Sequence, residues 1–437
     1  MARLCVVRSS DSIRVHAACN FRGRESTPAV SAAVLVGVVV ASAAGMLLAT
    51  ASALARAPKP EPVILVADVG VDDAAAVLWA LASPELEVLG IAATFGCHWD
   101  VRVTALNARR LLSAANRSGV PVLMGSRYQY GASEPPSADG SFFHGPCGFG
   151  STADGTCTEE SRDAAEADRR ISGSGGQSAA EFIAAKARAQ PGAVSVLSFS
   201  ALTNVALALA LEPALPRLLK RLVVMGGALY VHGNVSPLAE ANFAHDPRAA
   251  RLVAESFGRG DRSERRAEFV LAPLDVTMRS RVTPEHVARV GETGGAAYMF
   301  ADACVYYQRA YCDVHGPPFC DGVPLHDAHV VAFLTEPEMY TNVSEAPIDV
   351  AVARAGDAVH GACVVDRRPG SAARLAQKPR ARVLLDVDAD AFAASFIERV
   401  GGLWRVEERR EALRTRTREA RARQLSGEKE GEGSCAT

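Results

Sequence analysis

Short apolar runs rich in β-branched residues alternate with longer runs of helical periodicity from Pro62 onward. This alternation predicts right-handed βαβ units and therefore an α/β fold, with an open, mostly parallel sheet flanked by helices. The expected strands cover 63–67, 88–94, 120–124, 194–198, 222–225 and 269–271, and the expected helices 73–82, 101–115, 179–189 and 204–211. In folds of this class the ligand site lies beyond the carboxyl ends of the strands.

Three carboxylates follow the first expected strand. Asp68 stands at its carboxyl end, and Asp72 and Asp73 follow at the start of the next helix, with Gly70 between them. A single Asp at a helix start usually caps the helix by accepting bonds from free backbone N–H groups. Three acids within six residues exceed that need, and a cation would relieve their mutual repulsion. Oxygen donors of this kind favour Ca²⁺ or Mg²⁺.

Other expected strand ends carry polar residues as well. Notable positions after later strands and at a later helix start are Thr203, Met225-Gly-Gly, Asn234 and His326-Asp327. Each can be interpreted singly as a helix cap, a turn or a loop residue. Their shared position at the ends of elements instead favours one common site.

The N-terminal segment differs from the rest in composition. Residues 29–55 include no charged side chain and are mostly Ala and Val with scattered Leu, and basic residues precede them. This pattern suits a membrane-spanning helix, a cleaved signal peptide or an organelle transit sequence. Residues 1–60 are therefore set apart as a signal peptide or membrane anchor. The predicted localisation is the secretory pathway, as an extracellular or a single-pass membrane protein with its folded domain outside the cytoplasm.

Export changes the interpretation of the ten cysteines. They lack the CxxC pairs of a zinc ribbon, so disulfides are expected, with a pairing that the sequence leaves open. The folded domain is expected over 61–403, with a Gly- and Ser-rich segment at 128–176 as a lid or a surface insertion, and a charged tail over 404–437. A net charge of −2 indicates no concentrated basic face, so no nucleic-acid partner is expected.

The motifs at the strand ends resemble those of the inosine-uridine nucleoside hydrolase family, from about residue 62 to 400. The family's first-strand motif, Asp-x-Asp-Pro-Gly-x-Asp-Asp, is similar to Val-Ala-Asp-Val-Gly-Val-Asp-Asp at 66–73. Further matching segments lie at 200–204, 225–227, 233–235, 240–247, 274–277 and 326–327. The resemblance implies a Rossmann-like nucleoside hydrolase fold. It also implies an enzyme that hydrolyses the N-glycosidic bond of purine or pyrimidine ribonucleosides to free base and ribose.

The resemblance further implies roles for individual residues. A Ca²⁺ ion would be held by the side chains of Asp68, Asp73 and Asp327 and by the backbone carbonyl of Thr203. The ribose would be bound by Asp72, Asn234, Glu240 and Asn242, with Met225 lining its pocket. Asp68 would accept a proton from the attacking water, and His326 would protonate the departing base. Three more residues would lie near that base: His144, Tyr307 and Tyr311. Members of the family are often homodimers or homotetramers.

The chemistry of this reaction requires such residue types. Positive charge develops on the ribose and negative charge on the leaving base. A metal ion and a neighbouring carboxylate make water a better nucleophile. Asp, Asn and Glu side chains can bind the sugar hydroxyls, and a His can protonate the base. The three acids after the first strand thus divide between metal binding and sugar binding.

The sequence departs from the family pattern at several positions. Val66 replaces the first acid of the motif, which removes a carboxylate near the metal and is expected to lower metal affinity. Val69 replaces the Pro, in a turn that Gly70 can still make. Cys97 stands where many relatives have Asn and some have Cys. A reduced Cys97 would line the site beside Asp68, whereas a disulfide-bonded one would not.

Two other functions stay open on the sequence. One is a catalytically inactive relative that binds nucleosides or serves as a cell-surface interaction protein. Val66 and Cys97 suggest it, and the retained acids argue against it. The other is a metal-dependent phosphohydrolase, which would need a Lys or Arg for the phosphate, and none appears in the matching segments. Base preference is not determined, because the residues near the base lie in variable segments.

Overall fold

The structure, a computed structural model, describes residues 4–9, 12–17, 59–133, 140–150, 176–259, 266–317, 319–366, 368 and 378–402. It divides into two units, residues 1–59 and 60–437. Within the described part of the first unit, β1 (Leu4–Ser9) and β2 (Ser12–Ala17) pair as an antiparallel hairpin. The second unit contains all of the residues predicted to form the site.

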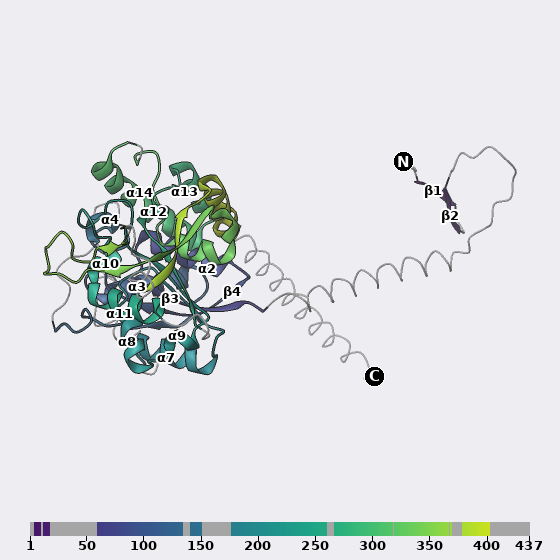
Figure 1. Ribbon diagram of the computed structural model, residues 1–437. Coiled ribbons are helices and arrows are strands. Elements are labelled where there is room, and N and C mark those ends of the chain that lie inside the picture. Colours follow the sequence, from purple (N-terminus) through teal and green to yellow (C-terminus); the bar gives the residue numbers. More distant parts are fainter. Residues whose placement is uncertain are drawn as a thin grey trace, which may run out of the picture. The chain divides into compact units, whose positions relative to one another are not determined.

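A sheet of eight strands forms the centre of the larger unit (Figure 1). Its order is β5-β4-β3-β6-β7-β8-β12-β9, and every neighbouring pair is parallel except β12 and β9. The strands are β3 (Glu61–Ala67), β4 (Leu86–Ala93), β5 (Val122–Leu123), β6 (Ser195–Ser198), β7 (Arg221–Met225), β8 (Glu268–Ala272), β9 (Asn342–Pro347) and β12 (Arg380–Asp386). A separate ribbon pairs β10 (Asp349–Val350) with β11 (Cys363–Val364). The mostly parallel sheet confirms the predicted α/β class.

Helices cover both faces of the sheet (Figure 1), because its central strands are apolar on both. In β3, Val63, Leu65 and Ala67 point into one core, and Ile64 and Val66 into the other, as strand alternation requires. The first core is covered by α2 (Val71–Ala82), α3 (Val101–Ala114), α14 (Gly295–His315), α15 (Ala328–Thr335) and a helix over 389–402. The second is covered by α7 (Ala179–Ala189), α8 (Thr203–Leu211) and α11 (Pro247–Gly258).

Short helices lie in the connections, and local polar residues determine where several helices begin. The short elements are α4 (Ser141–His144), α9 (Leu215–Leu218), α10 (Ala241–His245), α12 (Leu274–Thr277), α13 (Pro284–Gly291) and the 3₁₀ turn η2 (Pro337–Met339). Asp100 caps α3, Asp246 caps α11, and Ser178 and Glu181 form a capping box at α7.

The strand order reverses beside β3, and this places the site. β3 lies between β4, which follows it through α2, and β6, which comes later in the chain. A crevice forms at the carboxyl ends of two such strands, because their following helices leave toward opposite faces. Asp68 comes directly after β3, so the first of the three acids lies at this crevice.

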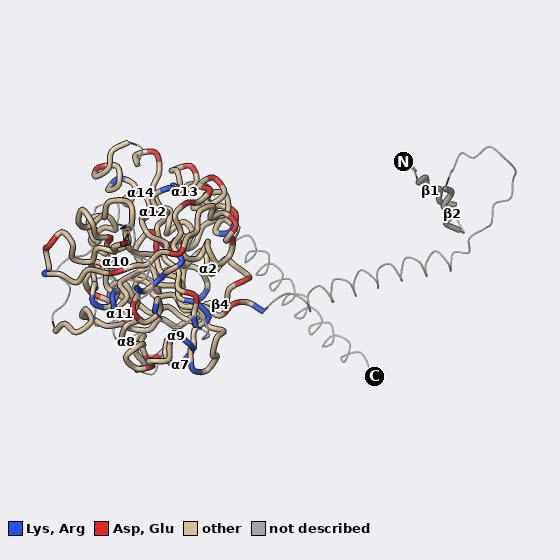
Figure 2. The backbone as a smooth tube through the Cα atoms, in the orientation of Figure 1, with Lys and Arg blue, Asp and Glu red and all other residues tan. Residues whose placement is uncertain are grey.

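The opposite edge of the sheet, where the strands begin, is crossed by ion pairs. Glu61 of β3 pairs with Lys220 and Arg221. Glu268 of β8 pairs with Arg221 and Arg382. Figure 2 shows Lys and Arg along the larger unit with Asp and Glu among them. Opposite charges therefore meet at the amino ends of these strands.

The expected strands and helices are confirmed to within two residues at each end. Two strands of the main sheet, β9 and β12, were not expected. In β9 only Ala346 is buried, and in β12 two arginines, Arg380 and Arg382, interrupt the apolar pattern. Because few residues of β9 are buried and arginines interrupt the apolar run of β12, the two strands give little periodic signal.

The predicted localisation is contradicted. A membrane span needs a helix of roughly 20 mostly apolar residues, and no helix in the described part of the chain is long and apolar enough to cross a bilayer. The prediction of a single-pass membrane protein is therefore wrong on this finding. The apolar run at 29–55 on which it rested lies outside the described residues, as do the tail over 404–437 and most of the predicted lid.

The cysteines are only partly paired. Cys312 at the end of α14 forms a disulfide with Cys320, and Cys147 is disulfide-bonded as well. Cys97, Cys304 and Cys363 are buried free thiols. The expectation of disulfides is thus met by some of the described cysteines, and Cys97 is not one of them.

Trp79 joins α2 to the helix over 389–402, and its removal should destabilise the domain. Its ring is fully buried and lies 5.3 Å from that of Phe392 and 5.9 Å from that of Phe396. We expect Trp79→Ala to lower the free energy of unfolding by about 3–5 kcal/mol, because it leaves a large cavity. Urea unfolding followed by circular dichroism measures this. The control is Tyr298→Ala, which removes a ring that is 63% exposed and should cost less than about 0.5 kcal/mol. Equal losses in the two variants would contradict the prediction.

Candidate active site

A cavity of ≈ 230 Å³ opens beyond the carboxyl ends of the central strands. It brings together every site residue predicted from the sequence except Thr203. These residues are Asp68, Asp72, Asp73, Cys97, His144, Met225, Asn234, Glu240, Asn242, Tyr307, Tyr311, His326 and Asp327. They come from the segments that follow β3, β4 and β7, from α4 and α14, and from the start of α15. Positions far apart in the sequence therefore line one site.

Asp73 fixes the turn between β3 and α2. Its Oδ1 accepts a hydrogen bond from the N–H of Asp68 and its Oδ2 one from the N–H of Gly70, both at 3.0 Å. Each oxygen keeps a further lone pair, so the carboxylate can cap the helix and still bind a cation. A Cβ at Gly70 would overlap Cys97 Sγ and lie 2.5 Å from His144 Nδ1. Glycine is therefore required at position 70, because Cys97 and His144 lie too close to its backbone to leave room for a side chain.

The loop after β4 holds Asp68. The Asp68 Oδ2 accepts a hydrogen bond from the backbone N–H of Cys97, and Cys97 Sγ lies 3.4 Å from Asp73 Oδ2. Gly96 permits this approach, because a Cβ at that position would overlap the Asp68 carboxylate. Gly96 and Cys97 thus bring a backbone donor and a thiol against the acids.

The acids of the cavity are buried, and no Lys or Arg among the described residues lines the cavity with them. Asp68, Asp72, Asp73 and Asp327 are each at most 5% exposed. Burial, followed by the neighbouring carboxyls, raises the pKa of Asp72 to about 8 and the pKa of Asp68 and Asp327 well above the usual range. Burial raises the pKa of Asp73 to about 6. None of the described residues that line the cavity is Lys or Arg. A cation would allow these carboxyls to ionise together.

The donor atoms are close enough to share a metal ion. One ligand atom from each of Asp72, Asp73 and Asp327 lies within 4.8 Å of the others. The same holds for one atom from each of Asp68, Asp73 and Cys97. Carboxylate oxygens favour hard divalent cations. The residues therefore fit a divalent metal ion, and Asp73 belongs to both groups.

Thr203 is not among the residues that line the cavity. It begins α8, is buried, and its Oγ1 donates to Asp246 Oδ2 at 2.6 Å. Asp246 also accepts from the N–H of Ala249 at the start of α11. The hydroxyl therefore ties α8 to α11. The role predicted for Thr203 concerns its carbonyl, and it stays a prediction.

Glu240 shapes a second wall of the cavity by binding backbone N–H groups. Its carboxylate accepts from Gly227 at 2.8 Å, from Asn242 at 2.7 Å and from Phe243 at 3.1 Å. Burial raises the pKa of Glu240 to about 7. The carboxylate thus caps α10 and links it to the glycine turn that follows β7.

Asn242 and Asn234 lie on the same side. The Asn242 Nδ2 donates to the carbonyl of Met225 at 3.3 Å, and Asn242 lines the cavity. Asn234 is exposed, and its Oδ1 accepts from the N–H of Ala241 at 2.9 Å. Asn234 therefore lines the cavity from its solvent side, and Asn242 from the interior.

A chain of hydrogen bonds crosses the opposite wall. Thr277 Oγ1 lies 2.6 Å from His326 Nδ1, and His326 Nε2 lies 2.7 Å from the hydroxyl of Tyr311. The hydroxyl of Tyr307 donates to that of Tyr311 at 3.4 Å. Burial lowers the pKa of His326 to about 3, so its ring is neutral near pH 7. Two hydroxyl partners therefore orient a neutral imidazole that carries one proton.

His144 of α4 lies beside Tyr307, with their ring centroids 5.2 Å apart. Its Nδ1 accepts from the N–H of Val71 at 3.1 Å and lies 3.9 Å from Asp72 Oδ1. A ring nitrogen that accepts a backbone N–H carries no proton itself. The proton of a neutral His144 is therefore on Nε2.

Several residues of the wall were not predicted from the sequence. Those that line the cavity include Phe142, Phe143, Phe199, His245 and His315. The Phe143 ring lies 5.0 Å from Tyr311, and the His315 ring 5.4 Å from it. A four-residue spacing from Tyr307 through Tyr311 to His315 places all three on one helix face. That spacing was a signal for His315, whereas Phe143 had none.

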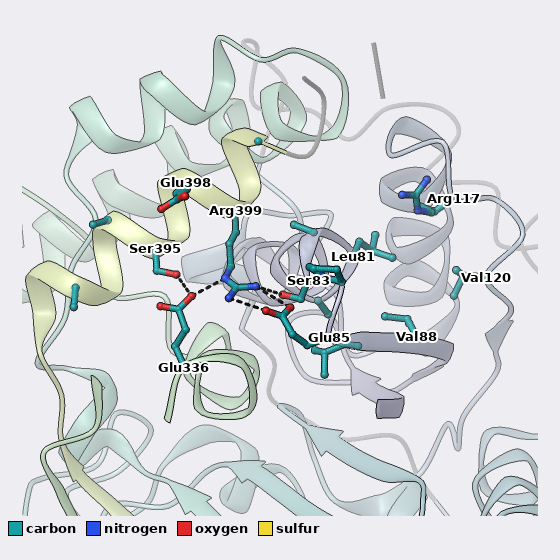
Figure 3. Close-up of a pocket in the computed structure, with 17 residues that line it drawn as sticks. Leu81, Ser83, Glu85, Val88, Arg117, Val120, Glu336, Ser395, Glu398 and Arg399 are labelled. Atoms are coloured by element: carbon teal, nitrogen blue, oxygen red, sulfur yellow. Dashed lines mark hydrogen bonds and ion pairs between the residues drawn. The ribbon is translucent and has the colours of Figure 1, made fainter. Parts of the chain in front are cut away.

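A larger cavity of ≈ 980 Å³ lies near the carboxyl end of α2. Figure 3 shows Arg399 between two acids there, with Nε 2.6 Å from Glu336 and Nη1 3.0 Å from Glu85. Ser395 also donates to Glu336. These charges satisfy one another, and the length of α2, about 18 Å, separates them from the buried acids. The smaller cavity is therefore the candidate active site.

The site joins acids that need a cation, polar side chains that suit sugar hydroxyls and an aromatic wall that suits a nucleobase. Hydrolysis of an N-glycosidic bond requires such a combination, and the chain is accordingly an N-glycosidase that acts on ribonucleosides. Residues 63–394 match the family described as inosine-uridine preferring nucleoside hydrolase. The chain belongs to this family.

Known relatives agree with this assignment. The chain is 33% identical over 287 residues to probable uridine nucleosidase 2 of Oryza sativa subsp. japonica, covering 65% of this chain and 77% of that one. It is 32% identical over 342 residues to the pyrimidine-specific ribonucleoside hydrolase RihA of Klebsiella pneumoniae, covering 78% and 98%. The solved purine-preferring ribonucleoside hydrolase from Gardnerella vaginalis has a TM-score of 0.64 at 26% identity, covering 79% and 100%.

The structure accommodates Val66, the departure in the first-strand motif. Val66 is fully buried in the core under α7, α8 and α11. Its carbonyl accepts from the N–H of Phe199 at 3.0 Å and from the hydroxyl of Ser200 at 3.1 Å. The Val66 side chain therefore packs against apolar neighbours and is not among the residues that line the cavity.

Gly96 offers a test of how the acids are held. We expect Gly96→Ala to lower the affinity for a divalent cation by about 10–100-fold, because the new methyl group displaces a supported ligand. Isothermal titration calorimetry with Ca²⁺ measures the affinity. Gly119→Ala is the matched control, since a Cβ there meets nothing within 4 Å. An unchanged affinity in Gly96→Ala would show that the Asp68 position does not matter for the cation.

Proposed function

We propose that this chain hydrolyses ribonucleosides to free base and ribose with the help of a Ca²⁺ ion. The observation that carries the proposal is the group of buried acids in a cavity whose described lining has no Lys or Arg. A phosphohydrolase would need such a cation-bearing residue for its substrate. The acids and the family relationship together favour sugar chemistry.

Asp68, Asp73 and Asp327 would hold the ion, with the carbonyl of Thr203 as a further ligand. A bound divalent cation lowers the pKa of a water molecule and so supplies a nucleophile. Asp68 would accept the proton of that water. Its carboxylate suits the task because the Cys97 N–H holds one oxygen in place and each carboxylate oxygen has more than one lone pair with which to accept a proton.

Asp72, Glu240, Asn242 and Asn234 would bind the ribose hydroxyls, and Met225 would lie against the sugar. Asp72 and Glu240 line the cavity from separate elements. Carboxylates that accept hydrogen bonds from the ribose hydroxyls also stabilise the positive charge that develops on the ribose. The sugar would therefore be held most tightly when the bond to the base is breaking.

The aromatic wall of Tyr307, Tyr311 and His144 would receive the base. His326 is neutral in the free chain, so to protonate the departing base it would first take up a proton in the substrate complex. The hydrogen bond between His326 and Tyr311 fixes the orientation of the His326 ring. The rings of Phe143 and His315 beside Tyr311 would exclude water from the departing base.

Uridine is the substrate to test first. The sequence relatives named above are described as a probable uridine nucleosidase and a pyrimidine-specific hydrolase. The solved relative from Gardnerella vaginalis is described as purine-preferring. A comparison of uridine with inosine therefore decides between two known preferences.

Asp68→Asn should lower the rate of ribose release from uridine by about 10²–10⁴-fold, because it removes a proton acceptor and weakens the cation site. Removal of Ca²⁺ by a chelator should abolish release, and added Ca²⁺ should restore it. Asp302→Asn, at an exposed position of α14, is the matched control and should leave the rate unchanged. The measurement is reducing sugar formed by the full chain.

Ribose release that survives both changes would remove the proposed roles of Asp68 and the ion. No release from either nucleoside by a folded, Ca²⁺-loaded chain would favour a nucleoside-binding relative without activity. Calorimetric binding of uridine without turnover would then identify that alternative.

His326→Gln tests protonation of the base. The amide keeps polar contact with Thr277 and Tyr311 but cannot supply an acidic proton, so uridine hydrolysis should fall by about 10²–10⁴-fold. Hydrolysis of 4-nitrophenyl riboside should change little, because nitrophenolate leaves without a proton. Equal losses of hydrolysis rate on both substrates would show instead that His326 positions the aromatic wall.

A further inference from the structure

The thiol of Cys97 is part of the acid cluster itself. It is 6% exposed and is not disulfide-bonded. Its Sγ lies 3.4 Å from Asp73 Oδ2, and one ligand atom from each of Cys97, Asp68 and Asp73 lies within 4.8 Å of the other two. Three potential metal ligands, one thiol and two carboxylates, therefore surround one small volume of the cavity.

Asp327 is a further buried acid beside this volume, in a second group of potential ligands that shares Asp73 with the first. Its carboxyl is 4% exposed and lines the same cavity. It stands at the N-cap of α15 but makes no capping hydrogen bond with its side chain. One of its ligand atoms lies within 4.8 Å of one from each of Asp72 and Asp73. A buried acid surrounded by other acids is unbalanced until a positive charge joins them.

The sulfur is held where it is by its surroundings. The backbone N–H of Cys97 donates to Asp68, which fixes the start of the side chain. On the other side, Gly70 lies so close to Sγ that a Cβ there would overlap it. The Sγ therefore has little freedom to turn away from Asp68 and Asp73.

Sulfur changes the metal preference of such a site. Carboxylate oxygens suit Ca²⁺ and Mg²⁺, whereas a thiolate selects softer ions such as Zn²⁺. We propose that Cys97 joins Asp68 and Asp73 as a ligand for a thiophilic divalent cation, of which Zn²⁺ and Cd²⁺ are the examples. The thiol releases its proton to solvent as the metal–sulfur bond forms, and no electron transfer is involved.

Binding of such an ion would also affect the proposed hydrolysis, and only this consequence rests on the proposed function. Asp68 and Asp73 are also the ligands proposed for Ca²⁺, so the two kinds of ion exclude each other. Zn²⁺ would then inhibit ribose release, and excess Ca²⁺ would compete with it. The binding site itself does not depend on whether the chain is active.

The test is titration of the full, Ca²⁺-free chain, with its disulfides intact, with Cd²⁺. We expect a sulfur-to-cadmium charge-transfer band in the ultraviolet that saturates at one ion per chain. Cys97→Ser should lose the band. Cys363→Ser, which removes another buried free thiol outside the cavity lining, should keep it. Calorimetry with Ca²⁺ should show that Cys97→Ser still binds the hard ion, and circular dichroism that it is folded.

A second measurement needs no variant. X-ray absorption at the zinc edge of the wild-type chain loaded with one Zn²⁺ should show one sulfur neighbour at about 2.3 Å among oxygen neighbours. A shell of oxygen and nitrogen alone, no cadmium band in the wild-type chain, or a band retained in Cys97→Ser would each overturn the proposal. None of these results depends on hydrolysis, so failure of the proposed function would be recognised separately.

Discussion

Two backbone N–H groups captured by one carboxylate set the geometry on which the site depends. The N–H groups of Asp68 and Gly70 both donate to Asp73, which folds the chain sharply between β3 and α2. The fold thereby turns Asp68 toward the loop after β4, where Gly96 and Cys97 receive it. The strand order then brings the later walls to this turn, because β6 and β7 lie beyond β3 in the sheet. Small changes in the conformation of this turn should therefore alter the geometry of the whole cavity.

Charge is distributed very differently at the two ends of the sheet. At the amino ends, Glu61 and Glu268 each meet basic side chains, and such partly exposed pairs contribute little individually. At the carboxyl ends, acids are buried together without a Lys or Arg in the described lining. Burial of that kind is unfavourable, and the remainder of the fold must offset it in the absence of a cation. Metal binding and stability of the domain should therefore be coupled.

Sequence reasoning reached the α/β class and most of the cavity because both follow from local patterns. Apolar runs located β3 to β8, and polar motifs at strand ends located acids such as Asp68 and Asp327. It could not find β9 and β12, since Arg380 and Arg382 break the apolar pattern of a strand whose partners are distant in the chain. It also missed Phe143, whose contact with Tyr311 depends on how α4 packs on α14. The predicted localisation depended on the apolar run at 29–55, which lies outside the described residues.

Val66 and Cys97 affect the site in different ways, although both depart from the family pattern. Val66 lies in β3 with its side chain in the core beneath α7, α8 and α11, so a Val there packs without meeting the cavity. Cys97 follows β4 and places its sulfur against Asp73, where any bound ion must accommodate it. The change at 66 is therefore absorbed by the core, whereas the change at 97 alters the ligand atoms themselves. The metal preference of this chain should consequently be determined at Cys97, by the softness of one sulfur among oxygens.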